Sequence, residues 1–468
     1  MADPTSRTLW HGRMASGPDD ALLAFTESLS FDIRLWRDDI AGSRAHVEGL
    51  GATGILGGDD VAAILGALDR VAEEFRSGSF VPAPTDEDVH TAIERRVTEL
   101  AGDAGARMHT GRSRNDQCVT ALRLWVRREL REVALSVVGL CGTLGRLADE
   151  AGTGDDGIVI PGYTHVQRAQ PVLLAHHFLA HGWALARDVE RMTEVLSRAD
   201  VSPLGAGALA GSTLPIDPVA NAVRLGFGAT FDNSLDAVSD RDFVAEALFC
   251  LALAGTHLSR IGEEFVLWTS SEFGFAALDD RFATGSSMLP QKKNADIAEL
   301  ARGKVGRLVG NLVSVLTVLK GLPLAYNRDL QEDKEPLFDS VDTVRRAVRA
   351  IDGMMSTATY SREAMTRAAV GGSIAAVDVA EWLVARGTPF REAHAVVGRL
   401  VRESGGEGAR LTVLVAAELG DDAAALLDGR QGLLRRTSHG ASGPTAVQAQ
   451  RVRYAERISS LSQRLGTP

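Results

Sequence analysis

Aromatic residues, cysteines and excess basic charge are all scarce in this sequence of 468 residues. Phe, Trp and Tyr make up only 5% of the chain, which favours a helical protein over a β-sandwich, whose strands are rich in aromatic and β-branched residues. Lysine and arginine number 50 against 61 acidic residues, a net charge of −11. Because no global positive field attracts polyanions, we expect neither nucleic acid nor a membrane surface as a partner.

Cysteine spacing and hydropathy exclude two further classes of protein. The three cysteines, Cys118, Cys141 and Cys250, are widely separated and lack metal-ligand spacing, so reduced thiols are expected. Residues 1–10 contain no apolar stretch of the kind found in a signal peptide. The longest run without charge, 201–216, contains two prolines and falls short of the ~20 apolar residues that a spanning helix needs. We expect a cytoplasmic protein without membrane spans.

Long helical periodicity dominates the middle of the chain, and no comparable run alternates with a period of two. Apolar residues recur every three or four positions over residues 119–147, 171–199, 243–268, 297–322 and 337–351. Helices of this length, at ~1.5 Å per residue, reach roughly 40–50 Å and bury their apolar faces by bundling. The first stretch carries a second apolar face, which indicates either a fully buried central helix or a subunit interface. The sequence therefore predicts an all-α fold with a central bundle of five long helices.

The flanks of the chain contain shorter helical patterns broken by Gly and Pro. A single core rarely grows beyond ~250–300 residues, so several domains are expected. We predict an N-terminal helical domain over 1–111, the long-helix bundle over 112–361 and a C-terminal helical domain over 362–468.

Three polar islands lie between the long helices. The first, His109–Gln117, places two arginines at a helix start, which is a natural anion site. The second, Gly162–Pro171, contains His165, a candidate general acid or base, ahead of a helix expected to begin near Pro171. The third, Thr284–Glu299, combines Ser286 with lysines before a helix expected to begin near Asn294. A serine acts as a base only if its alkoxide is stabilised, and a helix N-terminus or a lysine can do this.

A metal site is a separate possibility at His177 and His181, which have helical i, i+4 spacing. No third ligand is signalled nearby in the sequence, so we expect no metal there.

The islands, together with segments such as DEDVHTAIERR (86–96) and LPLAYNRDLQEDKEPLFDS (322–340), resemble the argininosuccinate lyases of the fumarase/aspartase superfamily over nearly the whole chain. The resemblance implies a three-domain fumarase/aspartase-like fold and reversible cleavage of argininosuccinate to fumarate and arginine, the last step of arginine biosynthesis. It also implies no cofactor, no metal, and a homotetramer whose sites are each shared between three subunits.

Motif matches to that family assign roles to individual residues. Ser286 is expected to be the base, His165 oriented by Glu299 the proton donor, and Lys292 with Asn294 the groups that stabilise developing charge; the reverse assignment of Ser286 and His165 stays open. The remaining substrate-binding residues implied by the resemblance are Ser28, Asp32, Ser113, Arg114, Asn115, Thr164, Arg241, Tyr326, Gln331 and Lys334.

The sequence departs from the family pattern in the third island, where Met288-Leu289-Pro290 and Asn294-Ala295 replace the usual Met-Pro and Asn-Pro pairs. No reactive group is lost. The alternatives are a lyase of the superfamily that acts on aspartate, fumarate or adenylosuccinate, or a non-catalytic, crystallin-like scaffold. The HTGRSRND string (109–116) argues against the first, and retention of His165, Ser286, Lys292 and Glu299 argues against the second.

Overall fold

The computed structural model describes residues 19–370 and 373–466, so residues 1–10, on which the expectation of no leader peptide rests, lie outside the described part. The chain divides into two compact units. Unit 1 comprises the described residues of Met1–Glu132, Met192–Ala252 and Arg307–Asp342, and unit 2 those of Val133–Arg191, Leu253–Gly306 and Thr343–Pro468. This division separates the chain into spatially compact units and does not test the predicted domain boundaries. The three domains with boundaries at 111 and 361 therefore stay a prediction.

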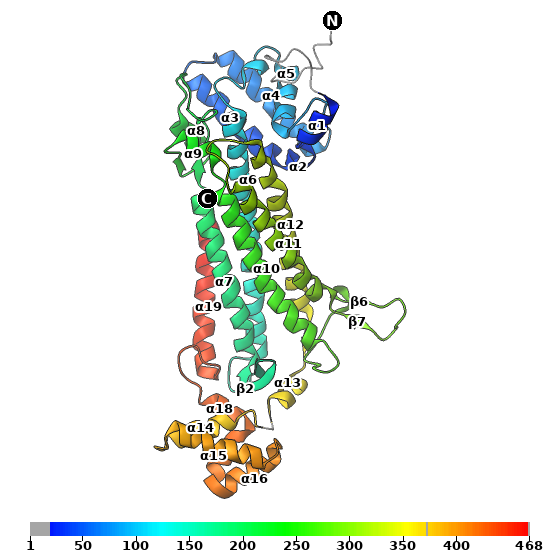
Figure 1. Cartoon of the computed structure of the whole chain (residues 1–468), viewed down its shortest axis with the longest axis vertical. Helices are drawn as coiled ribbons and strands as arrows, with labels where there is room; N and C mark the ends of the chain where they lie inside the picture. The colour runs from blue at the N-terminus through cyan, green and yellow to red at the C-terminus, as the bar shows by residue number, and fades with distance from the viewer. Residues whose placement is uncertain (1–18, 371–372, 467–468) are drawn as a thin grey trace. The chain divides into compact units, whose positions relative to one another are not determined.

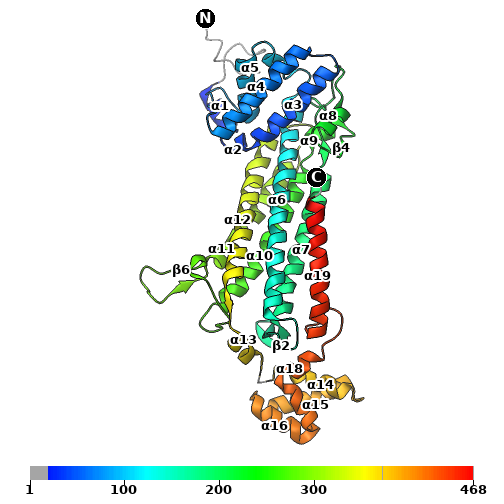
Figure 2. The ribbon, with the colours of Figure 1, turned by 180° about the vertical axis from the view of Figure 1, so that it is seen from behind.

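The predicted all-α class and the five long helices are confirmed (Figure 1). They are α6 (Arg114–Ala151), α7 (Leu174–Arg198), α10 (Asp242–Trp268), α11 (Asp296–Leu319) and α12 (Lys334–Thr357). A further long helix, α19 (Pro444–Gly466), runs beside α7 in both views (Figures 1 and 2). The phenolic oxygen of Tyr454 on α19 donates a hydrogen bond to the carbonyl of Cys141 on α6, at 2.8 Å.

The apolar stripe of α6 is buried as its spacing predicts: Val119, Leu122 and Val133 are each 0% exposed. The second apolar face, with Leu124 and Leu135, is only half-buried within the chain, so neither explanation of that face is excluded. Among the described helices, α10 alone is long and apolar enough to cross a membrane by length and composition, and 56% of its most apolar window is buried inside the protein. A mostly buried core helix meets the same criteria of length and composition, so one such helix is weak evidence for a membrane span.

Unit 1 is built on short helices that pack around the first half of α6. Helix α3 packs against α4 and α5, and Asp88 caps the start of α5 by accepting a hydrogen bond from the Thr91 N–H at 2.6 Å. The shorter elements of this unit are α1 (Asp20–Thr26), α2 (Leu29–Asp32), η3 (Ile33–Leu35), α3 (Trp36–Ala52), α4 (Gly58–Ser77), α5 (Val89–Ala101), η4 (Gly105–Arg107), β3 (Val201–Ser202), α8 (Pro218–Arg224), β4 (Ala229–Thr230), α9 (Ser234–Ser239) and η6 (Arg328–Asp333).

Unit 2 contains the remaining halves of the long helices, three two-stranded antiparallel sheets and the C-terminal helices. Its strands and the short helices near them are β1 (Val159–Thr164), β2 (Gln167–Leu173), β5 (Ala276–Ala277), η5 (Asp280–Phe282), β6 (Thr284–Gly285), β7 (Lys293–Asn294) and β8 (Thr359–Tyr360). The C-terminal elements are α13 (Arg362–Ala369), α14 (Ala376–Val384), α15 (Phe390–Glu403), α16 (Gly408–Leu419), α17 (Asp421–Ala424), η7 (Ala425–Asp428) and α18 (Arg430–Leu434). Helices α14 to α17 share a small core around Val379, Val397 and Val415.

Two predicted helix starts are wrong by a few residues, for the same physical reason. Pro171 lies in β2, opposite Pro161 of β1, and α7 begins only at Leu174. Asn294 lies in β7, opposite Thr284 of β6, and α11 begins at Asp296. In both places the chain pairs with a neighbouring segment before the helix begins, so local strand pairing overrides the helix-start signal.

Candidate active site

Unit 1 contains a cavity of about 670 Å³. Its walls come from α1 and α2, from the start of α5 and α6, and from η6 with the first residue of α12. Its volume falls within the ~300–1,000 Å³ typical of small-molecule sites. Seven of the substrate-binding residues expected from the sequence line it: Ser28, Asp32, Arg114, Asn115, Tyr326, Gln331 and Lys334.

The carboxyl group of Asp32 is fixed in the cavity wall by two donors. The hydroxyl of Ser28 donates to its Oδ2 at 2.6 Å, and the backbone N–H of Val89 donates to its Oδ1 at 2.9 Å. Burial outweighs these bonds and raises the pKa of Asp32 to about 6. A positive charge placed beside this carboxyl group in the cavity would favour its anionic form.

A buried ionic triad includes Lys334, another residue that lines the cavity. Asp333 accepts from the Nε of Arg241 at 2.5 Å and from the Nζ of Lys334 at 2.9 Å. Burial alone would lower the pKa of Lys334, but the charge of Asp333 raises it, so the ammonium persists. Arg241 and Asp333 do not line the cavity themselves; Arg241 is linked to the lining residue Lys334 through Asp333.

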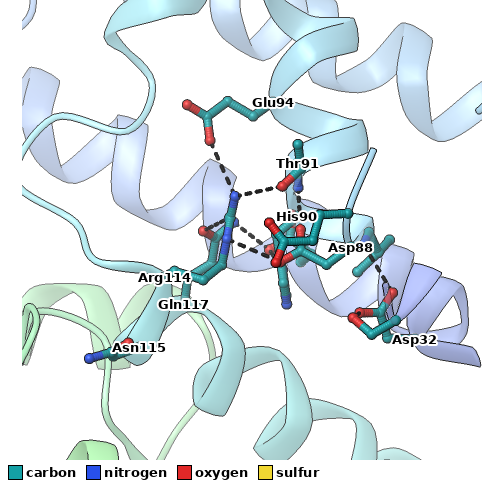
Figure 3. A network of polar contacts seen from close by, with 12 residues as sticks. Asp32, Asp88, His90, Thr91, Glu94, Arg114, Asn115 and Gln117 are labelled. Carbon is teal, nitrogen blue, oxygen red and sulfur yellow. Dashed lines mark hydrogen bonds and ion pairs between the residues drawn. The ribbon is translucent and has the colours of Figure 1, made fainter. Parts of the chain in front are cut away.

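The first island contains the start of α6, at Arg114. Its side chains bond to two different groups of partners. The Nε of Arg114 lies 3.3 Å from a carboxylate oxygen of Asp88, and its Nη2 donates to Thr91 Oγ1 at 3.2 Å (Figure 3). Asn115 points away from this cluster and donates to the carbonyl of Ala208 at 3.0 Å (Figure 3). Ser113 lies outside the cavity lining, where its hydroxyl accepts from the Asn115 N–H at 3.2 Å.

Sequence reasoning missed a second set of cavity residues on α5. His90 and Glu94 line the cavity, and the Nδ1 of His90 lies 2.7 Å from Asp39 Oδ1 in a pair that is 1% exposed on both sides. Burial by itself would lower the pKa of His90, but the charge and hydrogen bond of Asp39 raise it instead. Both residues lie in segment 86–96, which resembles the family, but the motif matches give no role to any residue of that segment.

The second island belongs to a β-hairpin, where a loop was expected, and as expected it leads into a long helix, α7. Thr164 pairs with Gln167, so His165 and Val166 alone form its tip. Both have positive φ, 54° and 61°, a conformation that costs a non-glycine residue about 1–3 kcal/mol and is typical of functional sites. Thr164 and His165 are exposed.

The third island forms a loop closed by the β6–β7 pair. The Oγ of Ser286 accepts hydrogen bonds from the backbone N–H groups of Met288 and Leu289, at 3.2 and 3.0 Å. Donors aimed at a hydroxyl oxygen also stabilise its anion. The stabilising groups expected from the sequence were a helix N-terminus or a lysine, whereas the donors on the Ser286 hydroxyl are backbone amides.

The two lysines of this loop have different surroundings. Lys293 is paired with Asp280 at 2.7 Å, whereas Lys292 is exposed and makes no ion pair within the described residues. Asn294 lies in β7, where its amide is 3.5 Å from the hydroxyl of Thr284. Glu299 lies in the exposed first turn of α11, and no hydrogen bond joins it to His165 in the described part of the chain.

The sequence-predicted site residues thus fall into two groups. The seven cavity residues, with Ser113 and Arg241 behind them, belong to unit 1. Those on the second and third islands belong to unit 2, and none of them lines the cavity: Thr164, His165, Ser286, Lys292, Asn294 and Glu299.

Comparison with known proteins agrees with this geometry. The lyase family model matches residues 12–310, and the model of the argininosuccinate lyase C-terminal region matches residues 373–431. The argininosuccinate lyase of Roseiflexus castenholzii is 48% identical over 452 residues, covering 95% of this chain and 98% of that protein.

Solved structures show the same fold. The crystal structure of an EDDS lyase in complex with formate has a TM-score of 0.82 at 29% identity, over 95% of this chain and 91% of that one. The class II fumarase of Schistosoma mansoni shares the fold at a TM-score of 0.75 and 17% identity, over 86% of this chain and 91% of that one. The fumarase/aspartase-like fold is therefore confirmed, and the chain belongs to the argininosuccinate lyase family.

Proposed function

We propose that this protein catalyses the reversible β-elimination of argininosuccinate to fumarate and L-arginine, as the last step of arginine biosynthesis in the cytoplasm. The observation that carries the proposal is the unit 1 cavity, which gathers seven of the expected substrate-binding residues. Full-length relatives named argininosuccinate lyase support the same conclusion.

The charges of the cavity suit this substrate. Argininosuccinate carries three carboxylates together with a guanidinium and an ammonium group. The cavity wall offers cations at Arg114, Arg328 and Lys334 and carboxylates at Asp32, Glu87, Asp88 and Glu94. Carboxylate–guanidinium and carboxylate–ammonium pairs are strong, oriented contacts. A cavity of mixed charge therefore binds a zwitterionic substrate in one orientation, which a purely basic pocket would not do.

The chemistry requires a base, charge stabilisation and an acid. Ser286 as an alkoxide removes the proton next to the succinyl carboxylate, and the two backbone amides on its oxygen favour that anion. The resulting aci-carboxylate carries two negative charges, which the unpaired ammonium of Lys292 and the amide of Asn294 stabilise. The carbon–nitrogen bond then breaks, and a protonated His165 gives its proton to the leaving guanidino nitrogen, which yields arginine and fumarate.

Assembly completes the site in this proposal. Ser286, Lys292 and His165 do not line the cavity of their own chain, and the segments that carry them are exposed. In a homotetramer, the cavity of one subunit would receive the His165 hairpin and the Ser286 loop from two others. Exposed apolar side chains on one side of α11, at Val309, Val313 and Leu316, support self-association because water-exposed apolar stripes favour burial.

The alternative function is that of a crystallin-like scaffold without catalysis. The specific feature that favours it is the altered loop sequence Met288-Leu289-Pro290. Against it stands the geometry of that loop, since Leu289 donates its backbone N–H to Ser286 and so takes part in the arrangement that the base needs.

Two measurements test the proposal. The first is the rise in absorbance of fumarate when argininosuccinate is added to the purified protein, compared with aspartate and adenylosuccinate added as alternative substrates in separate assays. If none of them yields fumarate, the non-catalytic scaffold is the function that remains. The second mixes inactive His165→Asn and Ser286→Ala proteins after joint unfolding and refolding. If the two residues of a site come from different chains, about one site in four escapes both lesions in a randomly mixed oligomer. No recovery in proven mixed tetramers would contradict the shared site.

A further inference from the structure

A cluster of two histidines and one glutamate on α7 and α10 lies apart from the residues assigned to catalysis. His177 and His181 are one helical turn apart on α7, and Glu264 faces them from α10, all within unit 2. The Nε2 atoms of both histidines lie 2.6 Å from the same carboxylate oxygen, Oε2 of Glu264. The two imidazoles therefore converge on one point.

Convergence of this kind is the geometry of a metal site. One donor atom from each of the three residues lies within 4.8 Å of the other two. A tetrahedral Zn²⁺ with bonds of ~2.0–2.1 Å holds its ligand atoms about 3.3 Å apart. Opening each imidazole–carboxylate contact by less than about 1 Å would make room for the ion between them, which is within reach of side-chain rotation.

The donor set also selects a class of metal. Imidazole nitrogens suit Zn²⁺ and its neighbours Co²⁺, Ni²⁺ and Cu²⁺, whereas Mg²⁺ and Ca²⁺ prefer oxygen ligands. Two histidines at i, i+4 and a glutamate from another segment form a three-ligand set known in zinc proteins, with water as the fourth ligand. The side chains are 23%, 15% and 33% exposed for His177, His181 and Glu264, so an ion and its water have access.

We propose that His177, His181 and Glu264 bind a divalent transition-metal ion, Zn²⁺ in the first place, that joins α7 to α10. The expectation of no metal at the two histidines rested on the lack of a third ligand near them in the sequence. The third ligand is 83 residues from His181 along the chain and reaches the pair only in the folded protein. The proposal concerns a metal-binding site apart from the residues assigned to catalysis and is independent of the proposed reaction.

A neighbouring pair on the same two helices provides a matched control. His257 on α10 lies 2.5 Å, through its Nδ1, from Oδ2 of Asp188 on α7. This pair repeats the contact between histidine and carboxylate but has only two ligands. If three converging donors are what the metal requires, loss of His257 leaves binding unchanged.

The test uses the full-length protein without a histidine tag, stripped of metal with a chelator. Isothermal titration with Zn²⁺ should show saturable binding of one ion per chain. His181→Ala and Glu264→Gln should each weaken binding by at least about 100-fold, because loss of a direct ligand costs more than the 10- to 100-fold typical of an outer-shell partner. His257→Ala should bind Zn²⁺ as the parent does. All three variants should keep the parental rate of fumarate formation, which also reports their folding.

Trp268 gives an independent spectroscopic readout. Its ring centroid lies 5.1 Å from that of His177, so Cu²⁺ bound at the cluster should quench its fluorescence. The sequence has 6 tryptophans, and the part of the quenching due to Trp268 is the difference between the parent and Trp268→Phe. No saturable Zn²⁺ binding to the parent would overturn the proposal, as would binding that Glu264→Gln and His181→Ala both leave intact.

Discussion

Replacing Lys334 with Met tests the role of the buried triad in the cavity. The substitution keeps an unbranched apolar stem and removes the ammonium that lines the cavity beside Asp333. A hydrogen bond to a charged group is worth about 1.5–3 kcal/mol. If Lys334 binds a substrate carboxylate, kcat/KM should fall roughly 10- to 150-fold, since each tenfold corresponds to about 1.4 kcal/mol. Most of the fall should appear as a higher KM if the contact is equally strong in the ground and transition states.

The companion variant, Asp333→Asn, separates binding from stability. In Lys334→Met the carboxylate of Asp333 still accepts from Arg241, so the folded state loses only one of two ionic contacts. In Asp333→Asn both cations remain buried without their anion, Arg241 at 0% and Lys334 at 3% side-chain exposure. Breaking a buried pair in this way costs about 3–5 kcal/mol. Asp333→Asn should therefore be clearly the less stable of the two.

The assay follows fumarate absorbance for kcat and KM and differential scanning fluorimetry for stability, at one protein concentration. Lys320→Met is the matched control, because Lys320 is exposed just beyond the end of α11 and touches no part of the cavity. A kcat/KM for Lys334→Met within about threefold of the parent would refute the binding role. Equal melting temperatures for Asp333→Asn and the parent would refute the account of the triad.

Three further predictions concern the loop and the buried pair in the wall of the cavity. Ser286→Ala should reduce kcat by orders of magnitude and leave substrate binding by calorimetry unchanged, because it removes a reacting oxygen and little packing; activity within about tenfold of the parent would contradict its role as base. Lys292→Arg should be severely damaging in the same assay because a planar fork replaces a compact ammonium, whereas Lys293→Arg, already paired to an aspartate, should retain most activity. His90 has a raised pKa, so the folded state holds its proton above the ordinary value of about 6.5, where the unfolded chain releases it. The stability advantage of the parent over His90→Asn in urea unfolding should therefore be full below that pH and shrink as the pH rises; an advantage that grows with pH would contradict the ion pair with Asp39.

The long helices could be predicted because their signal is local. Apolar residues at a spacing of three and four determine a buried stripe wherever the partner helix lies, and α6 buries its stripe as expected. The starts of α7 and α11 depend instead on whether another segment pairs with the residues just before them. Pro161 pairs with Pro171, and Thr284 pairs with Asn294. The sequence near Pro171 and Asn294 does not indicate either pairing.

The cavity shows the same limit for functional residues. Family resemblance identified seven lining residues by motif, whereas the pair of His90 and Asp39 is 51 positions apart and becomes an ion pair only when α3 and α5 pack together. Glu264 is a comparable case, because two of the three residues of its cluster are visible as an i, i+4 pattern on α7 and the third comes from α10. Pairing across elements depends on tertiary structure, which a single sequence does not contain.

The contrast in burial between the two groups of site residues has a physical meaning. Seven of the residues expected to bind substrate line a formed cavity, with Ser28, Asp32 and Lys334 buried even in the single chain. Of the residues expected to react, His165 and Lys292 are exposed to water and Ser286 is half-buried. Electrostatic stabilisation of a developing charge is weak in water and strong in a site from which water is excluded. Under the proposed function, a single chain would therefore have a binding site without the environment that the reaction needs, and burial of the two islands by other subunits would supply that environment. Assembly would then control catalysis itself, and substrate affinity would depend on it less.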